Sequence, residues 1–175
     1  MKTRPSFLTI EEGVITTTRQ YFDESGRITK TPLFGEADRN LFGETCRVLC
    51  EEVVWSTIRR KVELDCLCAR AFDFDELTPF GIVLDRAETL GFNRLNLEQI
   101  FLSHLAYGTQ PYGDELCAGM DERRDSDRGH YSRFWRLGHG KGGFYLKSDF
   151  ALPEGRKIKP GDVFLLARST PVVAG

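Results

Sequence analysis

Apolar and polar side chains alternate in several short segments near both ends of the chain, and this period of two predicts β-strands. The segment 14–22 fits two structures: its threonines favour a strand, whereas Thr16 could cap a short helix that runs to Glu24. A turn at 23–26 follows, because aspartate, serine and glycine there favour a chain reversal. The strand-like segments are 7–10, 27–31, 61–66, 131–137, 144–150, 157–158 and 162–166, the last two forming a pair joined through Pro160-Gly161.

The segment 46–72 is rich in β-branched and apolar residues and predicts a long antiparallel hairpin that turns near 56–59. Its second half alternates cleanly over 61–66, which is typical of a strand with one buried face. A helix through Cys46 to Trp55 stays open as an alternative for the first half.

Two helices are predicted in the middle of the chain. The first begins at Thr78-Pro79, a cap followed by a residue suited to the first helical position, and ends before Gly91. The second is predicted over 97–105, because apolar side chains recur there at helical spacing, and Asn96 is its cap. The pair loosely matches a helix-turn-helix, but its second helix carries no arginine or lysine for a phosphate, so DNA binding by these helices is disfavoured.

Residues 109–129 are polar and turn-rich, and they predict a long loop that could act as a lid. The glycine-rich segment 138–143 stands between two strands rather than before a helix, so it favours a hairpin turn over a phosphate cradle. Together these elements predict an α+β fold: an antiparallel sheet of about six strands with a helical pair packed on one face.

Composition is compatible with one folded unit. With 175 residues, of which 41% are hydrophobic, the chain can bury one core, and we predict a single domain over residues 1–175. No apolar run is long enough to cross a membrane and no signal sequence is apparent, so we expect a cytoplasmic protein with no membrane partner. The sequence does not distinguish a monomer from a homodimer.

The net charge of -2 hides an asymmetry along the chain. Residues 36–127 carry ten Lys and Arg against nineteen Asp and Glu, whereas residues 128–175 carry nine against three. The basic last third could face an anionic ligand or a nucleic acid, or it could screen the acidic middle of the same chain. The stretch 128–136 could stack on single-stranded nucleic acid, but a half-buried strand with arginines at its rim explains it equally well.

Metal, cofactor and nucleophile chemistry find little support. Cys46, Cys50, Cys66 and Cys68 could in principle bind zinc, but the last two lie in an alternating apolar run and are better explained as buried thiols. The three histidines have no serine or cysteine partner in a recognisable catalytic motif. We therefore expect no metal and no cofactor, and carboxylates and arginines remain as candidate site residues.

Four segments, taken in order, resemble the chorismate pyruvate-lyase family, whose fold also occurs in the ligand-binding domains of one class of bacterial transcription regulators. They are 9–16 with its acidic pair, 68–72 with small residues and an arginine, 132–137, and 145–153 with the run Lys-Ser-Asp-Phe-Ala-Leu-Pro. The resemblance implies a chorismate-lyase-like fold. It also implies elimination of pyruvate from chorismate, which leaves 4-hydroxybenzoate and needs no cofactor.

Carried over position by position, the resemblance places the family's catalytic glutamate on Asp149, whose side chain is one methylene shorter. The ungapped position of the substrate-binding arginine holds Glu51, so Arg47 takes that role when a longer hairpin is allowed, with Arg70 as second choice. The other pocket positions implied by the resemblance are Val14, Ile15, Leu95 and Asn96, the last two where the family has proline and leucine.

These expectations describe a protein that acts on or binds a small anionic cyclic or aromatic acid. A dianionic substrate needs an arginine fork for a carboxylate, and loss of the enolpyruvyl group needs a proton donor. The enzyme prediction is a carbon–oxygen lyase. The alternatives are a non-catalytic sensor domain of the same fold, favoured by the aspartate and the missing arginine, and a nucleic-acid-binding protein that uses the basic last third.

Overall fold

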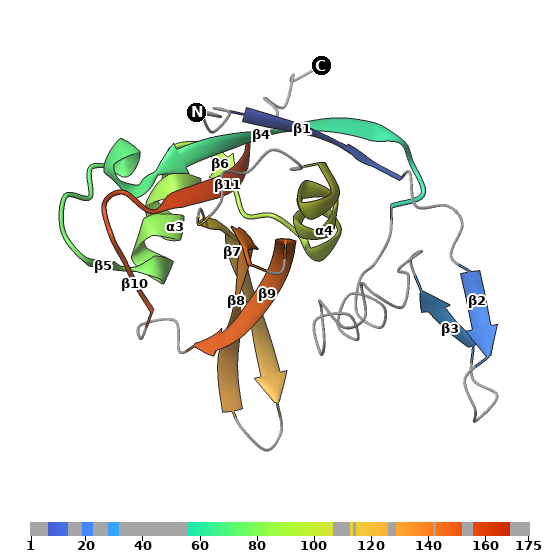
Figure 1. Cartoon of the computed structure of the whole chain (residues 1–175). Helices are drawn as coiled ribbons and strands as arrows, with labels where there is room; N and C mark the ends of the chain where they lie inside the picture. Colours follow the sequence, from blue (N-terminus) through green and yellow to red (C-terminus); the bar gives the residue numbers. More distant parts are fainter. Residues whose placement is uncertain are drawn as a thin grey trace.

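Figure 1 shows the computed structural model of the chain, in which a curled β-sheet is combined with two α-helices. The fold is α+β and most strand pairs are antiparallel, as the sequence predicts. The structure describes residues 7–13, 19–22, 28–31, 56–106, 113, 115–125, 129–141, 143–151 and 156–168.

The main sheet has seven strands rather than the six expected, in the order β1-β4-β11-β7-β8-β9, with β6 paired to β11. Strands β11 and β7 run parallel, which joins the two halves of the sheet. The strands are β1 (Phe7–Glu12), β4 (Arg60–Cys68), β6 (Phe92–Asn93), β7 (Glu115–Asp125), β8 (Gly129–Gly140), β9 (Gly143–Ala151) and β11 (Val163–Arg168).

Two small strand pairs lie outside this sheet. Strand β2 (Arg19–Phe22) pairs with β3 (Ile28–Thr31), so the described part of the ambiguous segment, 19–22, forms a strand, and 14–18 and 23–27 lie outside the described residues. Strand β10 (Lys157–Ile158) pairs with β5 (Thr78–Pro79). The predicted pairing of the last two strands is therefore wrong, because β11 pairs with β4, β6 and β7 instead.

Strand β4 confirms the alternation predicted for 61–66, but its described neighbours are β1 and β11. The expected hairpin partner, 46–55, lies outside the described residues. A 3₁₀ turn, η1 (Ala69–Phe72), follows β4 and ends at Asp73, which has a positive φ of 69°.

The predicted loop at 109–129 is wrong over most of its length, because 115–125 forms β7 and pairs with β8. Leu116, Cys117 and Ala118 of β7 are buried, and Gly119 stands at a bulge in the register. The charged run 121–125 suggests a loop in sequence. Backbone hydrogen bonds with β8 nevertheless hold this run as a strand, because backbone pairing does not require apolar side chains.

Both predicted helices are present, as α3 (Phe80–Thr89) and α4 (Leu97–Ala106). The cap predicted at Asn96 is confirmed: the Gln99 N–H donates to Asn96 Oδ1 over 2.8 Å, and the Asn96 N–H donates to Gln99 Oε1 over 3.0 Å. Helix α3 begins after Thr78-Pro79 rather than within it, because those two residues pair with β10.

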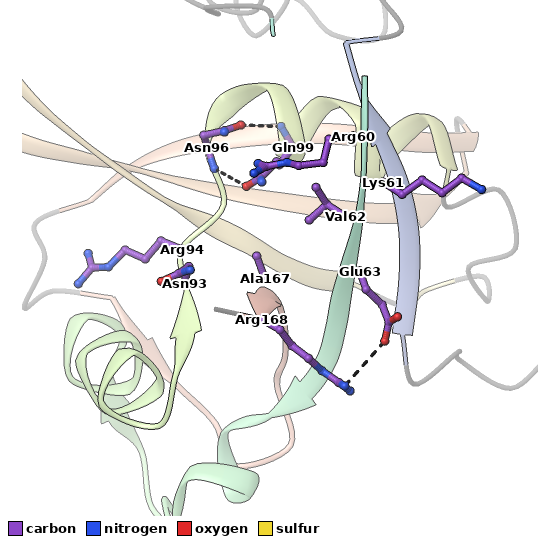
Figure 2. Close-up of a pocket in the computed structure, with 10 residues that line it drawn as sticks. All are labelled: Arg60, Lys61, Val62, Glu63, Asn93, Arg94, Asn96, Gln99, Ala167 and Arg168. Carbon is purple, nitrogen blue, oxygen red and sulfur yellow. Dashed lines mark hydrogen bonds and ion pairs between the residues drawn. The ribbon is translucent and has the colours of Figure 1, made fainter. Parts of the chain in front are cut away.

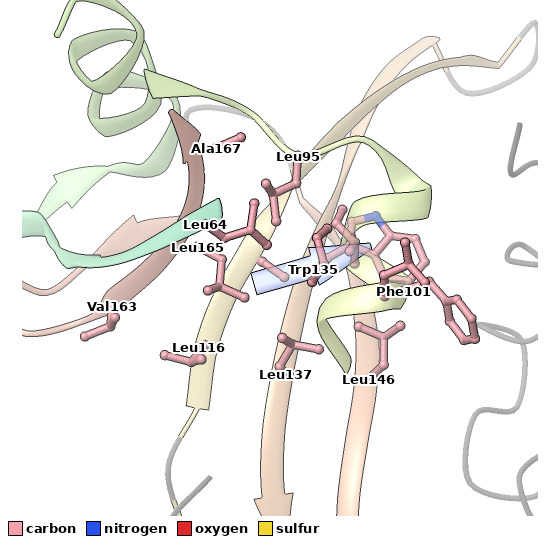
Figure 3. Packing of buried hydrophobic residues seen from close by; sticks show 14 residues of the cluster. Leu64, Leu95, Phe101, Leu116, Trp135, Leu137, Leu146, Val163, Leu165 and Ala167 are labelled. Atoms are coloured by element: carbon pink, nitrogen blue, oxygen red, sulfur yellow. The ribbon is translucent and has the colours of Figure 1, made fainter. Parts of the chain in front are cut away.

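The two helices cover opposite faces of the sheet. Along β11, Val163 and Leu165 belong to the apolar cluster that includes α4, drawn in Figure 3, whereas Phe164 and Leu166 belong to the cluster that includes α3. Successive side chains of a strand point to opposite faces. The predicted packing of a helical pair on one face is therefore wrong, and α3 and α4 do not form a helix-turn-helix.

Helix α4 lies inside the curl of the sheet, where it contacts β1, β7 and β9 (Figure 1). Its buried residues Ile100 and Phe101 pack with Trp135, which is fully buried. The first turn of α4 lies next to the end of β1 and the segment that leads into β4, because Gln99 donates to Glu12 and Glu98 accepts from Gly13 and Ser56. This junction positions the candidate site.

Candidate functional site

A groove of about 660 Å³ opens where β11 ends (Figure 2). Ala167 is the last residue of β11 that pairs with β4, opposite Leu64. Past this point β4 forms one wall, and the segment between β6 and α4 forms the other. The lining residues are Arg60, Lys61, Val62 and Glu63 from β4, Asn93, Arg94, Asn96 and Gln99 from the opposite wall, and Ala167 and Arg168 from β11.

Two arginines of the groove are anchored in the same way. Arg60 directs Nε and Nη2 to Glu12, at 2.9 and 2.7 Å, and Arg168 directs the same two nitrogens to Asp65, at 2.6 and 2.7 Å. Both acceptors are buried, whereas the arginine side chains are 66% and 63% exposed. A guanidinium held along its Nε–Nη2 edge keeps Nη1 on the opposite side, so each arginine has a rigid base. The Nη1 tip of Arg168 faces Glu63, whose Oε1 lies 3.9 Å away, beyond hydrogen-bond distance (Figure 2).

Arg94 completes the cationic lining from the other wall. Its Nε donates to Glu88 and its Nη2 donates to Asp85 over 2.8 Å. Every arginine of the groove thus has a carboxylate partner within the protein. The groove is therefore suited to hydrogen-bond one acceptor group in a defined place, rather than to attract a polyanion through uncompensated charge.

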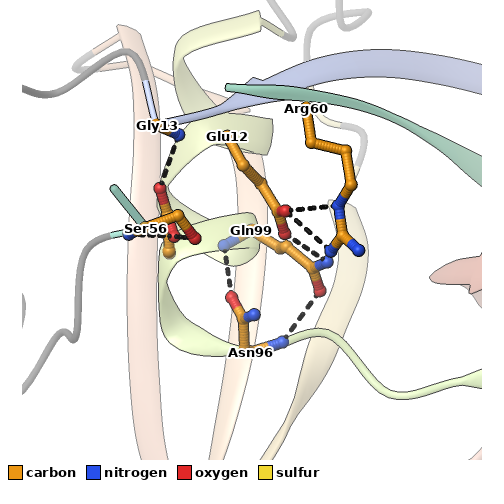
Figure 4. Close-up of polar contacts among 7 residues, drawn as sticks. Glu12, Gly13, Ser56, Arg60, Asn96 and Gln99 are labelled. Carbon is orange, nitrogen blue, oxygen red and sulfur yellow. Dashed lines mark hydrogen bonds and ion pairs between the residues drawn. The ribbon is translucent and has the colours of Figure 1, made fainter. Parts of the chain in front are cut away.

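A buried polar network supports the groove from below (Figure 4). Glu12, which holds Arg60, also accepts a hydrogen bond from Gln99 Nε2 at 2.8 Å. Glu98 is 2% exposed and accepts three bonds, from the Gly13 N–H, the Ser56 N–H and the Ser56 hydroxyl. Buried carboxylates are stable only when paired in this way, so the network fixes the positions of β1, β4 and α4 relative to each other.

Gly13 makes this junction possible. Its φ is +74°, and a Cβ at this position would lie 2.5 Å from the Ile58 carbonyl oxygen. A larger residue would have to displace the backbone that leads into β4, which also carries Arg60. The close approach brings the Gly13 N–H within 3.1 Å of Glu98.

Asp149 belongs to a second charged cluster, on β7, β8 and β9. It accepts a hydrogen bond from Arg136 Nη2 and lies 3.9 Å from Arg156 Nη1. Arg136 Nη1 donates to both oxygens of Glu115, at 2.8 and 2.9 Å, and the Tyr145 hydroxyl donates to Glu115 over 2.9 Å. Arg136 Nε is buried and has no acceptor among the described residues.

The environment of this cluster shifts two pKa values. Burial acts to lower the pKa of Arg136, but the hydrogen bond and charge of Glu115 outweigh it, so the pKa is raised. Burial, and then the hydrogen bond to Glu115, raises the pKa of Tyr145. Both groups therefore keep their protons. The cluster consists of a charged arginine and a neutral phenol around carboxylates that accept hydrogen bonds.

The other residues implied by the resemblance do not gather around Asp149. Arg70 pairs with Asp75 at 3.4 Å and its side chain is 69% exposed. Leu95 is part of the apolar cluster around α4, and Asn96 caps α4 and lines the groove. Arg47, Val14 and Ile15 lie outside the described residues. Sequence reasoning thus found one lining residue of the groove, Asn96, and missed Arg60, Arg94 and Arg168.

The aromatic stretch on β8 does not form a stacking platform from the rings that are described. Phe134 is 1% exposed and Trp135 is 0% exposed, and they belong to opposite apolar clusters. Arg136, the next residue, is ion-paired to Glu115 and Asp149. The alternative prediction of a half-buried strand is therefore confirmed for these residues, and the rings of Phe134 and Trp135 are not accessible to nucleic-acid bases.

The described cysteines are Cys66, Cys68 and Cys117, and none of them lies in a disulfide. Cys66 and Cys68 are half-buried rather than buried as predicted, and Cys117 is buried. Cys46 and Cys50 lie outside the described residues, so the zinc site considered for the four cysteines is not tested. Within the described residues, no group of three His, Cys, Asp or Glu side chains could hold a metal ion. No helix in this part of the chain is long and apolar enough to cross a membrane.

Comparison with known proteins leaves the groove as the main guide to function. The chain matches no family model, no curated protein and no solved structure. The likeness to chorismate pyruvate-lyases thus stays a prediction from sequence, and the function has to be argued from the geometry of the site.

Proposed function

We propose that the protein binds a small organic acid through its carboxylate, in the groove at the end of β11. The observation that carries the proposal is the shared anchoring of Arg60 and Arg168. Each is held along one edge by a buried carboxylate and lines the groove with its tip, and the tip of Arg168 lies 3.9 Å from Glu63, too far for a hydrogen bond. The volume of about 660 Å³ lies within the range of about 300–1,000 Å³ typical of small-molecule sites.

The anchoring favours binding in two ways. A guanidinium that is already fixed loses less conformational entropy when it takes a second acceptor. The carboxylates that hold the arginines also remove most of the net positive charge, so affinity depends on directed hydrogen bonds. This combination supports recognition of one carboxylate at a defined position and does not favour binding of a nucleic acid backbone.

Elimination of pyruvate from chorismate, with Asp149 as proton donor, is a competing proposal, because Asp149 does not line the groove and belongs to the cluster on β7, β8 and β9. Asp149 accepts a hydrogen bond from Arg136 and lies close to Arg156. A carboxylate in that position must take up a proton and leave Arg136 before it can protonate the ether oxygen of chorismate. This requirement supports binding without turnover, the sensor alternative, over catalysis.

Calorimetric titration with benzoate, 4-hydroxybenzoate and chorismate tests binding, and the absorbance of 4-hydroxybenzoate tests turnover of chorismate. We expect Arg168→Gln to weaken binding about tenfold, since a hydrogen bond to a charged group contributes about 1.5–3 kcal/mol and is partly screened here. The matched control is Arg86→Gln, an ion-paired arginine outside the groove, and it should bind as the wild type does.

Failure of all three acids to bind at millimolar concentration, or equal losses in both variants, would contradict the proposal. Turnover of chorismate that Asp149→Asn abolishes would favour the lyase over the sensor.

A further inference from the structure

The groove is lined mainly by polar side chains (Figure 2). Among the described lining residues, Val62 and Ala167 are the only apolar ones, and the others carry amides, a carboxylate or cationic groups. Small-molecule sites are usually lined by hydrophobic and aromatic side chains with a few polar groups. A ligand with an apolar body would cover this polar lining without replacing its hydrogen bonds to water, which weakens binding. The lining therefore favours a ligand that carries hydrogen-bonding groups in addition to its carboxylate.

One wall of the groove presents side-chain amides. Asn96 Oδ1 accepts from the Gln99 N–H as the cap of α4, and this bond fixes which way the amide is turned. In the part of the chain that the structure describes, Asn96 Nδ2 has no acceptor and the Asn93 amide has no hydrogen-bond partner. Both asparagines are exposed and line the groove. They can hydrogen-bond a ligand without giving up a contact inside the protein.

The amide wall is held in place relative to the opposite wall. Gln99 Nε2 donates to Glu12, which also holds Arg60, and Gln99 Oε1 accepts from the Asn96 N–H (Figure 4). Gln99 and Glu12 are buried. A continuous chain of hydrogen bonds thus connects Asn96 to Arg60. An amide donor for a ligand oxygen and a guanidinium for a carboxylate therefore stand at fixed positions before a ligand binds.

The amides lie on the same side of the sheet as Arg60. Asn93 pairs with Ala167, and Ala167 pairs with Leu64, so these three side chains share a face of the sheet. Arg60 stands four residues before Leu64 on β4 and shares that face, because side chains alternate along a strand. At this point β4 and β6 lie two strand spacings apart, about 9.6 Å, so one small ligand can reach both walls.

We infer that the acid bound in this groove carries several hydroxyl groups and belongs to the class of sugar acids. The inference rests on the proposed function and names the class of ligand. A hydroxyl group both donates and accepts, and a side-chain amide does the same, so neighbouring hydroxyls of a sugar ring match the amides of Asn93 and Asn96. The arginines of the groove take the carboxylate. An acid without hydroxyls uses the arginines alone and should bind more weakly.

Calorimetric titration of the full chain with three probes tests the inference. Methyl β-D-glucuronide carries a carboxylate and hydroxyls on one ring. Cyclohexanecarboxylate carries the carboxylate on a ring of the same size without hydroxyls, and methyl β-D-glucoside carries hydroxyls without a carboxylate. We expect the glucuronide to bind about tenfold more tightly than cyclohexanecarboxylate, through one or two added hydrogen bonds, and the glucoside not to bind at millimolar concentration.

Two variants assign this difference to the amides. Asn96→Ser keeps a residue suited to cap a helix, and Asn93→Ala lies outside that cap. Each should weaken binding of the glucuronide about threefold and leave the affinity for cyclohexanecarboxylate unchanged. The ratio of the two affinities is the readout, because a loss of folded protein would lower binding of both acids alike.

The outcomes separate this inference from the proposed function. Equal affinity for the glucuronide and cyclohexanecarboxylate in the wild type, or a ratio that neither variant changes, would overturn the inference and leave the carboxylate site intact. Binding of the glucoside as tightly as the glucuronide would show that the carboxylate is not recognised, and would overturn the proposed function together with the inference. Failure of both acids to bind would overturn the two together as well.

Discussion

Two clusters of arginine and carboxylate side chains in this protein use the same groups in opposite ways. In the cluster on β7, β8 and β9, Arg136 directs Nη1 to Glu115 and Nη2 to Asp149, and its Nε is buried without an acceptor in the described residues. In the groove, Arg60 and Arg168 direct Nε and Nη2 to one buried carboxylate each, and Arg168 Nη1 lies 3.9 Å from the exposed Glu63.

The difference lies in where the carboxylates stand. Glu115 and Asp149 hold Arg136 from both ends, and its side chain is 20% exposed, so the cluster is closed and ties three strands together. Glu12 and Asp65 are buried on one side of their arginines, so the tips reach the groove. Both clusters contain arginines that pair with carboxylates, so the presence of ion pairs does not distinguish a structural role from ligand binding. Their geometry indicates that one stabilises the fold and the other binds a ligand.

Replacing Arg136 should have the largest effect on stability. Arg136→Met leaves Glu115 and Asp149 without the arginine that both of them pair with. We expect a loss of about 3 kcal/mol in the free energy of unfolding, near the lower end for a broken buried pair because both carboxylates keep some contact with water. Guanidinium chloride denaturation measures it. Arg70→Met, which breaks an exposed pair, should cost less than about 0.5 kcal/mol, and equal losses would refute the structural role of the closed cluster.

Removing the Tyr145 hydroxyl should have a smaller effect that depends on pH. Tyr145→Phe deletes the hydrogen bond to Glu115 and should cost about 1 kcal/mol at neutral pH. The pKa of Tyr145 is raised by burial and by Glu115, so the folded state holds the phenol proton more tightly than the unfolded state does. This contribution is complete below about pH 10, the ordinary tyrosine value, and is lost as pH rises through the folded pKa.

Thermal melts of wild type and Tyr145→Phe between neutral and strongly alkaline pH check the sign of this dependence. The stability difference between the two proteins should narrow as the solution becomes alkaline. A difference that stays constant or grows would show that the phenol proton is not held by the fold.

The local parts of the fold could be predicted from sequence. Alternation located β4 and the β8–β9 hairpin, and an asparagine before apolar side chains at helical spacing marked the cap at Asn96. The strand β7 was hidden by its charged second half, since its partner β8 and not its own composition holds it. The order of the strands and the faces on which the helices pack depend on contacts distant in sequence, which periodicity does not contain.

The candidate site could hardly be predicted. Arg60 and Arg168 stand at the first residue of β4 and the last residue of β11, so no spacing in the sequence connects them. They line one groove because β11 runs antiparallel beside β4, which brings the last residue of β11 close to the first residues of β4. Asn96 was named through a family resemblance, and it lines the groove for a different reason, as the cap of α4. Whether Asp149 acts as an acid stays a prediction.

The most direct test of the account is the affinity for 4-hydroxybenzoate, measured by calorimetry in wild type, Arg60→Gln and Arg156→Gln. Arg60 lines the groove, whereas Arg156 lies over the Phe134 ring and near Asp149 in the closed cluster. We expect Arg60→Gln to weaken binding about tenfold and Arg156→Gln to leave it unchanged. Loss of affinity in Arg156→Gln with wild-type affinity in Arg60→Gln would contradict the account, because it would place the ligand beside Asp149.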